Sequence, residues 1–309
     1  MAGVGSIVGG AFGLLRERPV SVLIWAATYC VGSVLISFAI VFAMFGAILP
    51  DPQTMTQPGS FLGTGLGLML LLYLVLLFLL VVLMNAVFRA MLRPEEGGFA
   101  FMRVGMDEFR MFGLVLLVFI GLFVAVLVGE LLLILLVTII NFVIGQGPIT
   151  AVLTFLLFLG FLGTVIWAEV RLSLIFPLSF YRRRMSLDGA WALTKGHFWT
   201  LFFSYLLVGL IFVIAGGLLV WTMMGSYFTA MFQAAGDPAQ IEAAGQAFAA
   251  QQFAMSMGTR ILYWVIGAIF AAAWFALGPG LLASATRELV VDEDEAAIFA
   301  AESDGSVVD

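Results

Sequence analysis

Residues 167–199 read WAEVRLSLIFPLSFYRRRMSLDGAWALTKGHFW. This stretch contains the end of one apolar run, three consecutive arginines, a short amphipathic segment and the start of the next apolar run. Bases and tryptophans gathered between two long apolar runs are typical of a junction at the headgroup level of a membrane. Elsewhere the chain carries few charged residues, and most of them lie at similar junctions. This alternation of long apolar runs with short charged junctions predicts a fold of membrane-spanning helices.

The composition places the chain in the class of integral membrane proteins. It has 309 residues, of which 63% are hydrophobic and 10% are charged. Soluble domains are about half apolar and about a quarter charged, so the difference is large. The single cysteine, Cys30, excludes a disulfide framework within the chain.

Six apolar runs are long enough to cross a bilayer, which takes roughly 20 residues of helix. Lipid offers no partner to free backbone groups, so each run is predicted to be a helix. The runs lie at about 20–48, 63–91, 113–143, 150–178, 198–224 and 260–284. The predicted fold class is therefore an all-α integral membrane protein with six transmembrane helices.

The basic residues predict the orientation. Twelve of the 13 Lys and Arg residues fall on one side of the six runs, and only Arg260 falls on the other. Basic loops stay in the cytoplasm, so we expect both termini to be cytoplasmic.

Two segments lie outside the six runs and have distinct compositions. In residues 225–259, Asp237 and Pro238 predict the start of a short helix, with Asp as the cap and Pro at the first position. Residues 288–309 are acidic and lack a long apolar run. We expect them to form a mobile cytoplasmic tail on a single six-span domain, residues 1–287.

An internal repeat is suggested by two similar stretches. Residues 10–23 read GAFGLLRERPVSVL and residues 189–202 read GAWALTKGHFWTLF; a weaker third copy starts at Val104. The simplest account is three units, at about 1–94, 95–181 and 182–287, each an interfacial amphipathic helix followed by a helical hairpin. The alternative is chance, because amphipathic junctions share composition.

A first set of candidate site residues lies within or at the edges of the apolar runs: Asn85, Arg89, Glu130, Glu169 and Arg171. Glu130 is either a proton or cation site or a neutral acid bonded to a neighbouring helix, and in both cases it is predicted to be shielded from lipid. Glu169 and Arg171 are two residues apart and cannot simply pair with each other.

Partners for these groups must therefore come from elsewhere. Arg171 could meet Glu130 or a lipid phosphate, and Glu169 could meet Arg89. For Glu169 and Arg171, the sequence is consistent both with a structural ion pair between helices and with a role in transport. Asn85 is interpreted as a hydrogen-bonding contact between helices.

A second set forms a basic belt at the predicted cytoplasmic interface: Arg182, Arg183, Arg184, Lys195 and His197. Such bases can act as topology signals that attract anionic lipid, at about 1 kcal/mol each, or can form a specific phosphate-headgroup site. We predict that residues 186–196 form an interfacial helix with Trp191 buried. No second His or Cys lies near His197, and the sequence contains no metal, cofactor or catalytic motif.

The same stretch resembles a family of bacterial inner-membrane proteins, namely the membrane domain found beside some glycerophosphoryl diester phosphodiesterases and the related YciC-like proteins. The resemblance is carried by Arg171, Ser173, Leu174, Pro177, Ser186, Leu187, Ala190, Trp191, Leu193, Lys195, Gly196, Phe198 and Trp199. It implies a multi-span inner-membrane domain and supplies no catalytic residues.

Two functions are consistent with these observations. The first is a non-enzymatic inner-membrane protein that binds, organises or moves phospholipid, with anionic phospholipid as its partner. The alternative is a proton-coupled or small-solute transporter that uses Glu130, Glu169 and Arg171. A pocket open sideways to lipid would favour the first, and a polar cavity at mid-membrane the second. We expect no nucleic-acid partner, and the sequence indicates no particular protein partner.

Overall fold

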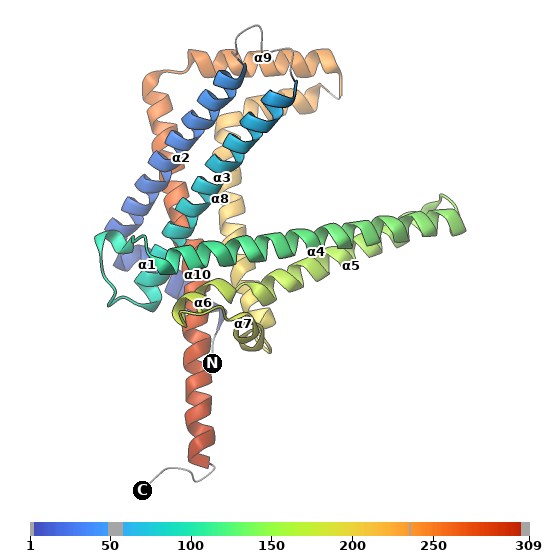
Figure 1. The fold of residues 1–309 in the computed structure, drawn as a ribbon. Coiled ribbons are helices and arrows are strands. Elements are labelled where there is room, and N and C mark those ends of the chain that lie inside the picture. The colour runs from blue at the N-terminus through green and yellow to red at the C-terminus, as the bar shows by residue number, and fades with distance from the viewer. Residues whose placement is uncertain (1–2, 49–57, 235, 304–309) are drawn as a thin grey trace.

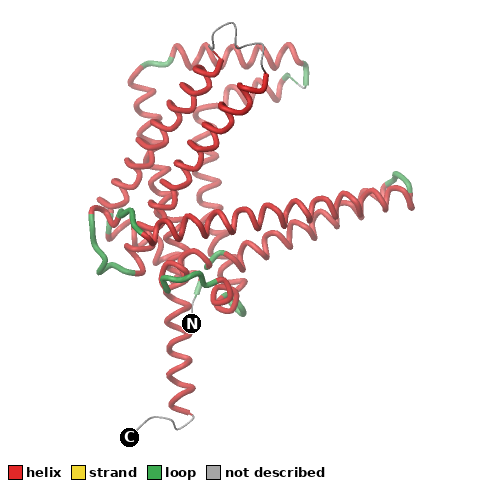
Figure 2. The backbone as a smooth tube through the Cα atoms, in the orientation of Figure 1, coloured by secondary structure: helices red, strands yellow, loops and turns green. Residues whose placement is uncertain are grey.

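The computed structural model describes residues 3–48, 58–234 and 236–303, and every regular element in these ranges is a helix (Figure 2). In chain order the elements are α1 Val4–Glu17, α2 Pro19–Ile48, α3 Pro58–Leu92, the single-turn 3₁₀ helix η1 Phe99–Phe101, α4 Met106–Ile144, α5 Pro148–Leu172, α6 Ile175–Tyr181, α7 Leu187–Leu193, α8 Phe198–Gln233, α9 Pro238–Ala254 and α10 Met257–Ser303.

The predicted fold class is confirmed. Six of these helices (α2, α3, α4, α5, α8 and α10) are long and apolar enough to span a membrane, and they match the six predicted runs. Their side chains are apolar around most of the helix circumference, as expected for segments surrounded by lipid and by other helices.

Four of the long helices form a bundle (Figure 1). α2 packs against α3, and α10 packs against α2, α3 and α8. The amphipathic helix α1 lies across the end of this bundle, with Ile7, Ala11 and Leu14 buried against it. Gly10 is needed at this crossing, because a Cβ there would lie 2.2 Å from Ser284 Oγ.

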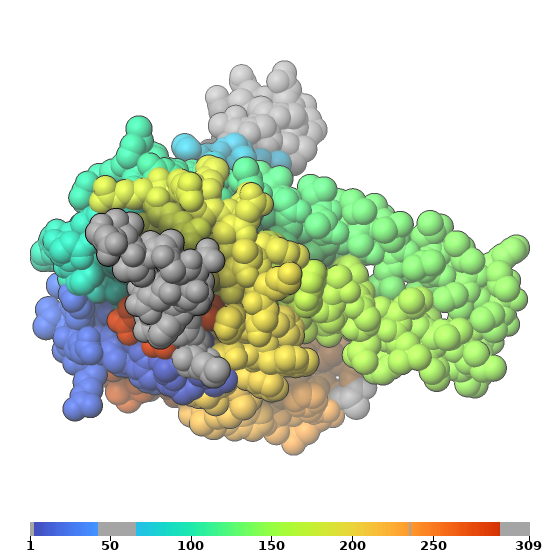
Figure 3. Space-filling view, turned by 90° about the horizontal axis from the view of Figure 1, so that it is seen from below, coloured from blue at the N-terminus to red at the C-terminus, as the bar shows by residue number. Residues whose placement is uncertain are grey.

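The α4–α5 hairpin leaves the bundle at a wide angle and extends sideways (Figures 1 and 3). α4 is anchored at its start by the buried side chains of Met111 and Leu114. Further along, α4 and α5 pack against each other, and Gly129 lies so close to Phe161 that a Cβ would approach its ring to 2.5 Å. Most of the remaining hairpin surface is exposed and apolar.

The helix predicted from Asp237 and Pro238 is present as α9. Asp237 caps it, because its Oδ1 accepts a hydrogen bond from the Ala239 backbone N–H at 3.0 Å. α9 packs on α8 at the end of the bundle opposite α1. The Asp-Pro signal therefore predicted the helix start correctly.

The structure modifies two predictions about the domain plan. α10 continues as one helix to Ser303, with Leu289 buried, so residues 288–303 are helical in this structure. The three-unit repeat is not confirmed: α1 precedes α2 and α7 precedes α8, but the segment before α4 contains only the short η1 and an irregular stretch.

Candidate functional site at the basic end of the bundle

The end of the bundle where α1, η1, α6 and α7 gather carries most of the basic residues, and we call it the basic end (Figure 1). A network of charged side chains from α3, the loop after α3, α4 and the loop after α6 lies at its centre. Its members are Arg89, Arg93, Glu96, Asp107, Glu108, Arg110 and Arg183.

The pair at the centre of the network is Arg89 and Glu108, and each side chain is 1% exposed. Arg89 Nη2 donates to Glu108 Oε1 at 2.5 Å, and Glu108 Oε2 accepts from the Gly105 backbone N–H at 2.9 Å. Arg89 therefore neutralises the carboxylate that caps the first turn of α4. The suggestion that Glu169 meets Arg89 is wrong, because Glu108 occupies that role.

Two backbone carbonyls in the loop between α3 and α4 hold this region together. Ala100 and Phe101 have positive φ angles of 49° and 58°, which non-glycine residues rarely adopt. The Ala100 carbonyl accepts from Trp25 Nε1 at 2.7 Å, and the Phe101 carbonyl accepts from Arg89 Nη1 at 2.6 Å. Side chains of α2 and α3 thus fix the turn that leads into the hairpin.

Arg93 extends the network to α6. Its Nη2 donates to the Phe180 carbonyl and, at 3.0 Å, to the Tyr181 carbonyl. These carbonyls lie at the end of α6, where helix carbonyls have no partner within the helix. The Arg93 guanidinium also lies 4.6 Å from the centre of the Phe180 ring, and its Nη1 lies 3.5 Å from Asp107.

Arg183, a member of the predicted basic belt, belongs to this network. It forms an ion pair with Glu96, and its backbone carbonyl accepts a hydrogen bond from Arg110. Its charge is therefore compensated within the protein. Arg182 lies against Gly189, where a Cβ would approach the Arg182 Nη1 to 2.7 Å.

Arg184 and Lys195 differ from their neighbours. Both residues are exposed, and neither side chain makes a hydrogen bond or ion pair with the described part of the chain. They flank the seven-residue helix α7, one before its start and the other after its end. The helix predicted over residues 186–196 is present as α7, which is shorter and covers Leu187–Leu193.

Arg171 lies behind α7. Its Nη1 is 3.3 Å from Thr194 Oγ1, and its guanidinium lies 4.9 Å from the centre of the Trp191 ring. It thus meets neither Glu130 nor any other acid in the described residues. Trp191 is 40% exposed, so the prediction that it is buried in the protein is wrong. His197 precedes α8, and its Nδ1 is buried without a hydrogen-bond partner in the described structure.

The two intramembrane acids lie on the hairpin, away from the network. Glu130 on α4 and Glu169 on α5 are both exposed, and neither has a polar partner within the described residues. The prediction that Glu130 is shielded is wrong for the single chain. Because Gly129 faces Phe161, the levels of Glu130 and Glu169 differ by about 12–14 Å along the hairpin.

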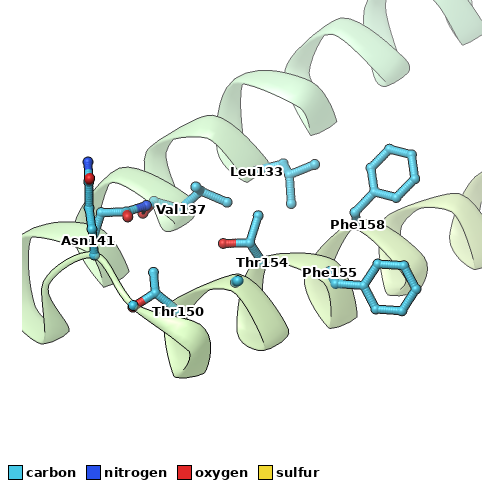
Figure 4. Close-up of a pocket in the computed structure, with 10 residues that line it drawn as sticks. Leu133, Val137, Asn141, Thr150, Thr154, Phe155 and Phe158 are labelled. Carbon is cyan, nitrogen blue, oxygen red and sulfur yellow. Dashed lines mark hydrogen bonds between the residues drawn. The ribbon is translucent and has the colours of Figure 1, made fainter.

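A groove runs between α4 and α5 near the tip of the hairpin (Figure 4). Its volume is about 650 Å³, and it is open to the surroundings. Its walls combine apolar and polar side chains from both helices: Leu133, Val137, Asn141, Gln146, Thr150, Thr154, Phe155 and Phe158. This groove opens on the side of the hairpin, where lipid would surround it.

Asn85 is fully buried on α3, and neither atom of its amide has a hydrogen-bond partner in the described structure. The predicted hydrogen bond to another helix is therefore not formed there. Asn141 bonds within its own helix, donating to the Val137 carbonyl at 2.8 Å.

The acids of the network were not among the residues predicted from the sequence. Glu96, Asp107 and Glu108 follow Arg89 within 19 positions, and Glu108 stands three residues after Gly105, where a helix-capping acid is expected. That local signal could have identified Glu108 as a cap, although not as the partner of Arg89.

The described residues contain no group of His, Cys, Asp and Glu side chains that could hold a metal ion. Comparisons with protein-family models, with curated proteins and with solved structures found no match to this chain. The family resemblance of residues 167–199 therefore stays a prediction.

Proposed function

We propose that this chain is a non-enzymatic protein of the bacterial inner membrane that binds phospholipid, with anionic headgroups held at its basic end. The observation that carries the proposal is the pair of exposed, uncompensated bases, Arg184 and Lys195, at the two ends of α7. Within the basic belt, Arg183 already contacts an acid, whereas Arg184 and Lys195 have no partner in the described residues and are available to an external anion.

The surroundings of these bases suit a lipid headgroup. Trp191 and Trp199 are 40% and 65% exposed, and Leu187 is 41% exposed. Tryptophan is enriched at membrane interfaces because it combines an apolar ring with a polar N–H. A base beside an anionic leaflet contributes about 1 kcal/mol of attraction, so these two free bases together favour anionic over zwitterionic lipid by roughly tenfold or more.

The groove between α4 and α5 also supports lipid association rather than solute transport. It opens sideways and its walls include Phe155 and Phe158, so it does not form the polar cavity that a transported solute would need. The transporter alternative relies on Glu130, Glu169 and Arg171 acting together. Arg171 contacts α7 and pairs with neither acid, and the levels of Glu130 and Glu169 differ by about 12–14 Å along the hairpin, so the three do not form one site.

Quenching of tryptophan fluorescence tests the proposal. The protein is reconstituted into vesicles with brominated phosphatidylglycerol or brominated phosphatidylcholine. We expect stronger quenching by the anionic lipid, and loss of that preference in the Arg184→Gln/Lys195→Gln variant. Arg260→Gln removes an exposed base near the opposite end and serves as the control. Equal quenching by both lipids in the unmodified protein would refute the proposal.

The proposed orientation has its own test. If both termini are cytoplasmic, reporter fusions at residues 100 and 187 are expected to report the cytoplasm, and fusions at 146 and 240 the outside. A cytoplasmic signal at 240 would overturn this topology, because α9 would then share a side with the basic end.

A further inference from the structure

The α4–α5 hairpin has two different sides. Asn141, Phe155 and Phe158 line one groove, so they lie on the same side of the hairpin (Figure 4). On α4, Glu130, Ile134 and Asn141 are spaced i, i+4 and i+11, which places them on one stripe of an α-helix. On α5, Phe155, Phe158 and Glu169 are likewise spaced i, i+3 and i+14 and share a stripe.

Both unpartnered acids therefore lie on the groove side of the hairpin, which we call the acidic side. The opposite side of α4 presents Val128, Leu132 and Ile139, and all three are exposed and apolar. A hairpin surrounded only by lipid would gain nothing from such a division. Lipid contact does not account for the acidic side, because charged and amide groups in transmembrane helices face other helices or water.

The chain's own bundle does not supply that protein in this structure. α4 contacts α3 and α6 near its start, α5 contacts α7 and α8 near its end, and the hairpin then departs sideways (Figure 3). Glu130 lies about 21 Å along α4 from Ile144 and is therefore far from both ends of the hairpin. The outward-facing side chains of α8 along its middle are apolar, for example Leu206, Leu210 and Val213.

We propose that the acidic side of the α4–α5 hairpin is the interface between two copies of this chain. Two copies inserted in the same orientation are related by a two-fold axis along the membrane normal, so equivalent residues lie at equal depth. An asparagine amide both donates and accepts hydrogen bonds, and a carboxyl group accepts them. Asn141 and Glu130 can therefore hydrogen bond with polar groups of the second copy.

The size of the surface is adequate for this role. α5, the shorter helix of the hairpin, extends for about 38 Å from Pro148 to Leu172, and a face two helices wide measures about 20 Å. The product is roughly 760 Å², close to the 800 Å² or so that each partner buries in a standard interface. The groove walls, including Phe155, offer space for side chains of the second copy.

Cysteine cross-linking in native membranes tests this interface. Cys30 is first replaced by alanine. Single cysteines are then introduced one helical turn on either side of Glu130, as Leu127→Cys and Ile134→Cys. Val128→Cys and Leu132→Cys are matched controls, because they lie at nearly the same depth on the opposite side and are also exposed. Oxidation or a short bifunctional reagent links equivalent positions, and the dimer is measured on denaturing gels.

We expect several-fold more cross-linked dimer from the cysteines at 127 and 134 than from those at 128 and 132. In addition, Glu130→Leu combined with Asn141→Leu is expected to reduce the cross-linking at 134, whereas Val128→Leu is not. Equal cross-linking on both sides would overturn the proposal. Absence of cross-linking at 127 and 134, in variants inserted at normal levels, would also overturn it and would leave lipid as the occupant of the groove.

Discussion

Removing one member of the Arg89–Glu108 pair is expected to destabilise the basic end strongly. Both side chains are 1% exposed and their charged atoms lie 2.5 Å apart, so Glu108→Ala leaves a buried guanidinium without its main counter-ion. The nearest other acid to Arg89 is Glu96, whose Oε2 lies 3.8 Å from Arg89 Nε. Breaking a buried pair in this way costs about 3–5 kcal/mol.

Glu108→Ala also removes the acceptor for the Gly105 N–H, which adds about 1 kcal/mol for a lost helix cap. On the scale of soluble domains, where 1 kcal/mol shifts the midpoint by about 2–4 °C, the total corresponds to a decrease of roughly 8–24 °C. The midpoint is measured in detergent as the temperature at which half of the protein is lost from its size-exclusion peak.

The double variant Arg89→Met/Glu108→Leu separates a lost ion pair from general disruption. Replacing both partners by apolar residues leaves no buried charge, so we expect its midpoint to lie above that of Glu108→Ala. Arg184→Ala, which removes an exposed base without a described partner, is the control and should leave the midpoint unchanged. A midpoint for Glu108→Ala equal to that of the control would refute the assignment of this pair as a structural centre.

Two further stability predictions concern the same end of the bundle. Gly10→Val is expected to lower the midpoint, because its Cβ would lie 2.2 Å from Ser284 Oγ and 3.2 Å from Ser284 Cβ. Gly9→Ala is the control and should leave the midpoint unchanged, because the space around Gly9 is open. Equal midpoints for the two variants would contradict the close crossing of α1 and α10. Trp25→Phe keeps an aromatic ring but loses the 2.7 Å hydrogen bond to the Ala100 carbonyl. We expect denaturant titration to show a decrease of about 1–2 kcal/mol in the free energy of unfolding. An unchanged free energy of unfolding would contradict that hydrogen bond.

The sequence predicted the elements whose signals are local. Length and apolar composition identify all six long helices, because a run of roughly 20 apolar residues is rare in soluble proteins and is long enough to span a bilayer as a helix. The start of α9 was predictable for a similar reason, since an Asp cap and a Pro at the first position act within one turn.

The residues that the sequence placed wrongly depend on how distant segments meet. Arg89 finds its acid across a loop in which Ala100 and Phe101 adopt left-handed backbone angles, and neither residue type signals such a turn. Glu130 lies in a helix that is apolar around most of its circumference, so its sequence does not show whether the chain's own bundle covers the side that carries Glu130. Glu130 is exposed because the α4–α5 hairpin extends away from the bundle, and the sequence does not predict that direction.

The lipid retained after purification tests the central proposal most directly. The unmodified protein and the Arg184→Gln/Lys195→Gln variant are purified in the same mild detergent, and bound phosphatidylglycerol, cardiolipin and phosphatidylethanolamine are quantified by mass spectrometry. We predict that the variant remains folded and inserted, and that its ratio of anionic to zwitterionic lipid falls several-fold. An unchanged ratio in a correctly oriented variant would contradict the proposal and would leave these bases as signals for topology alone.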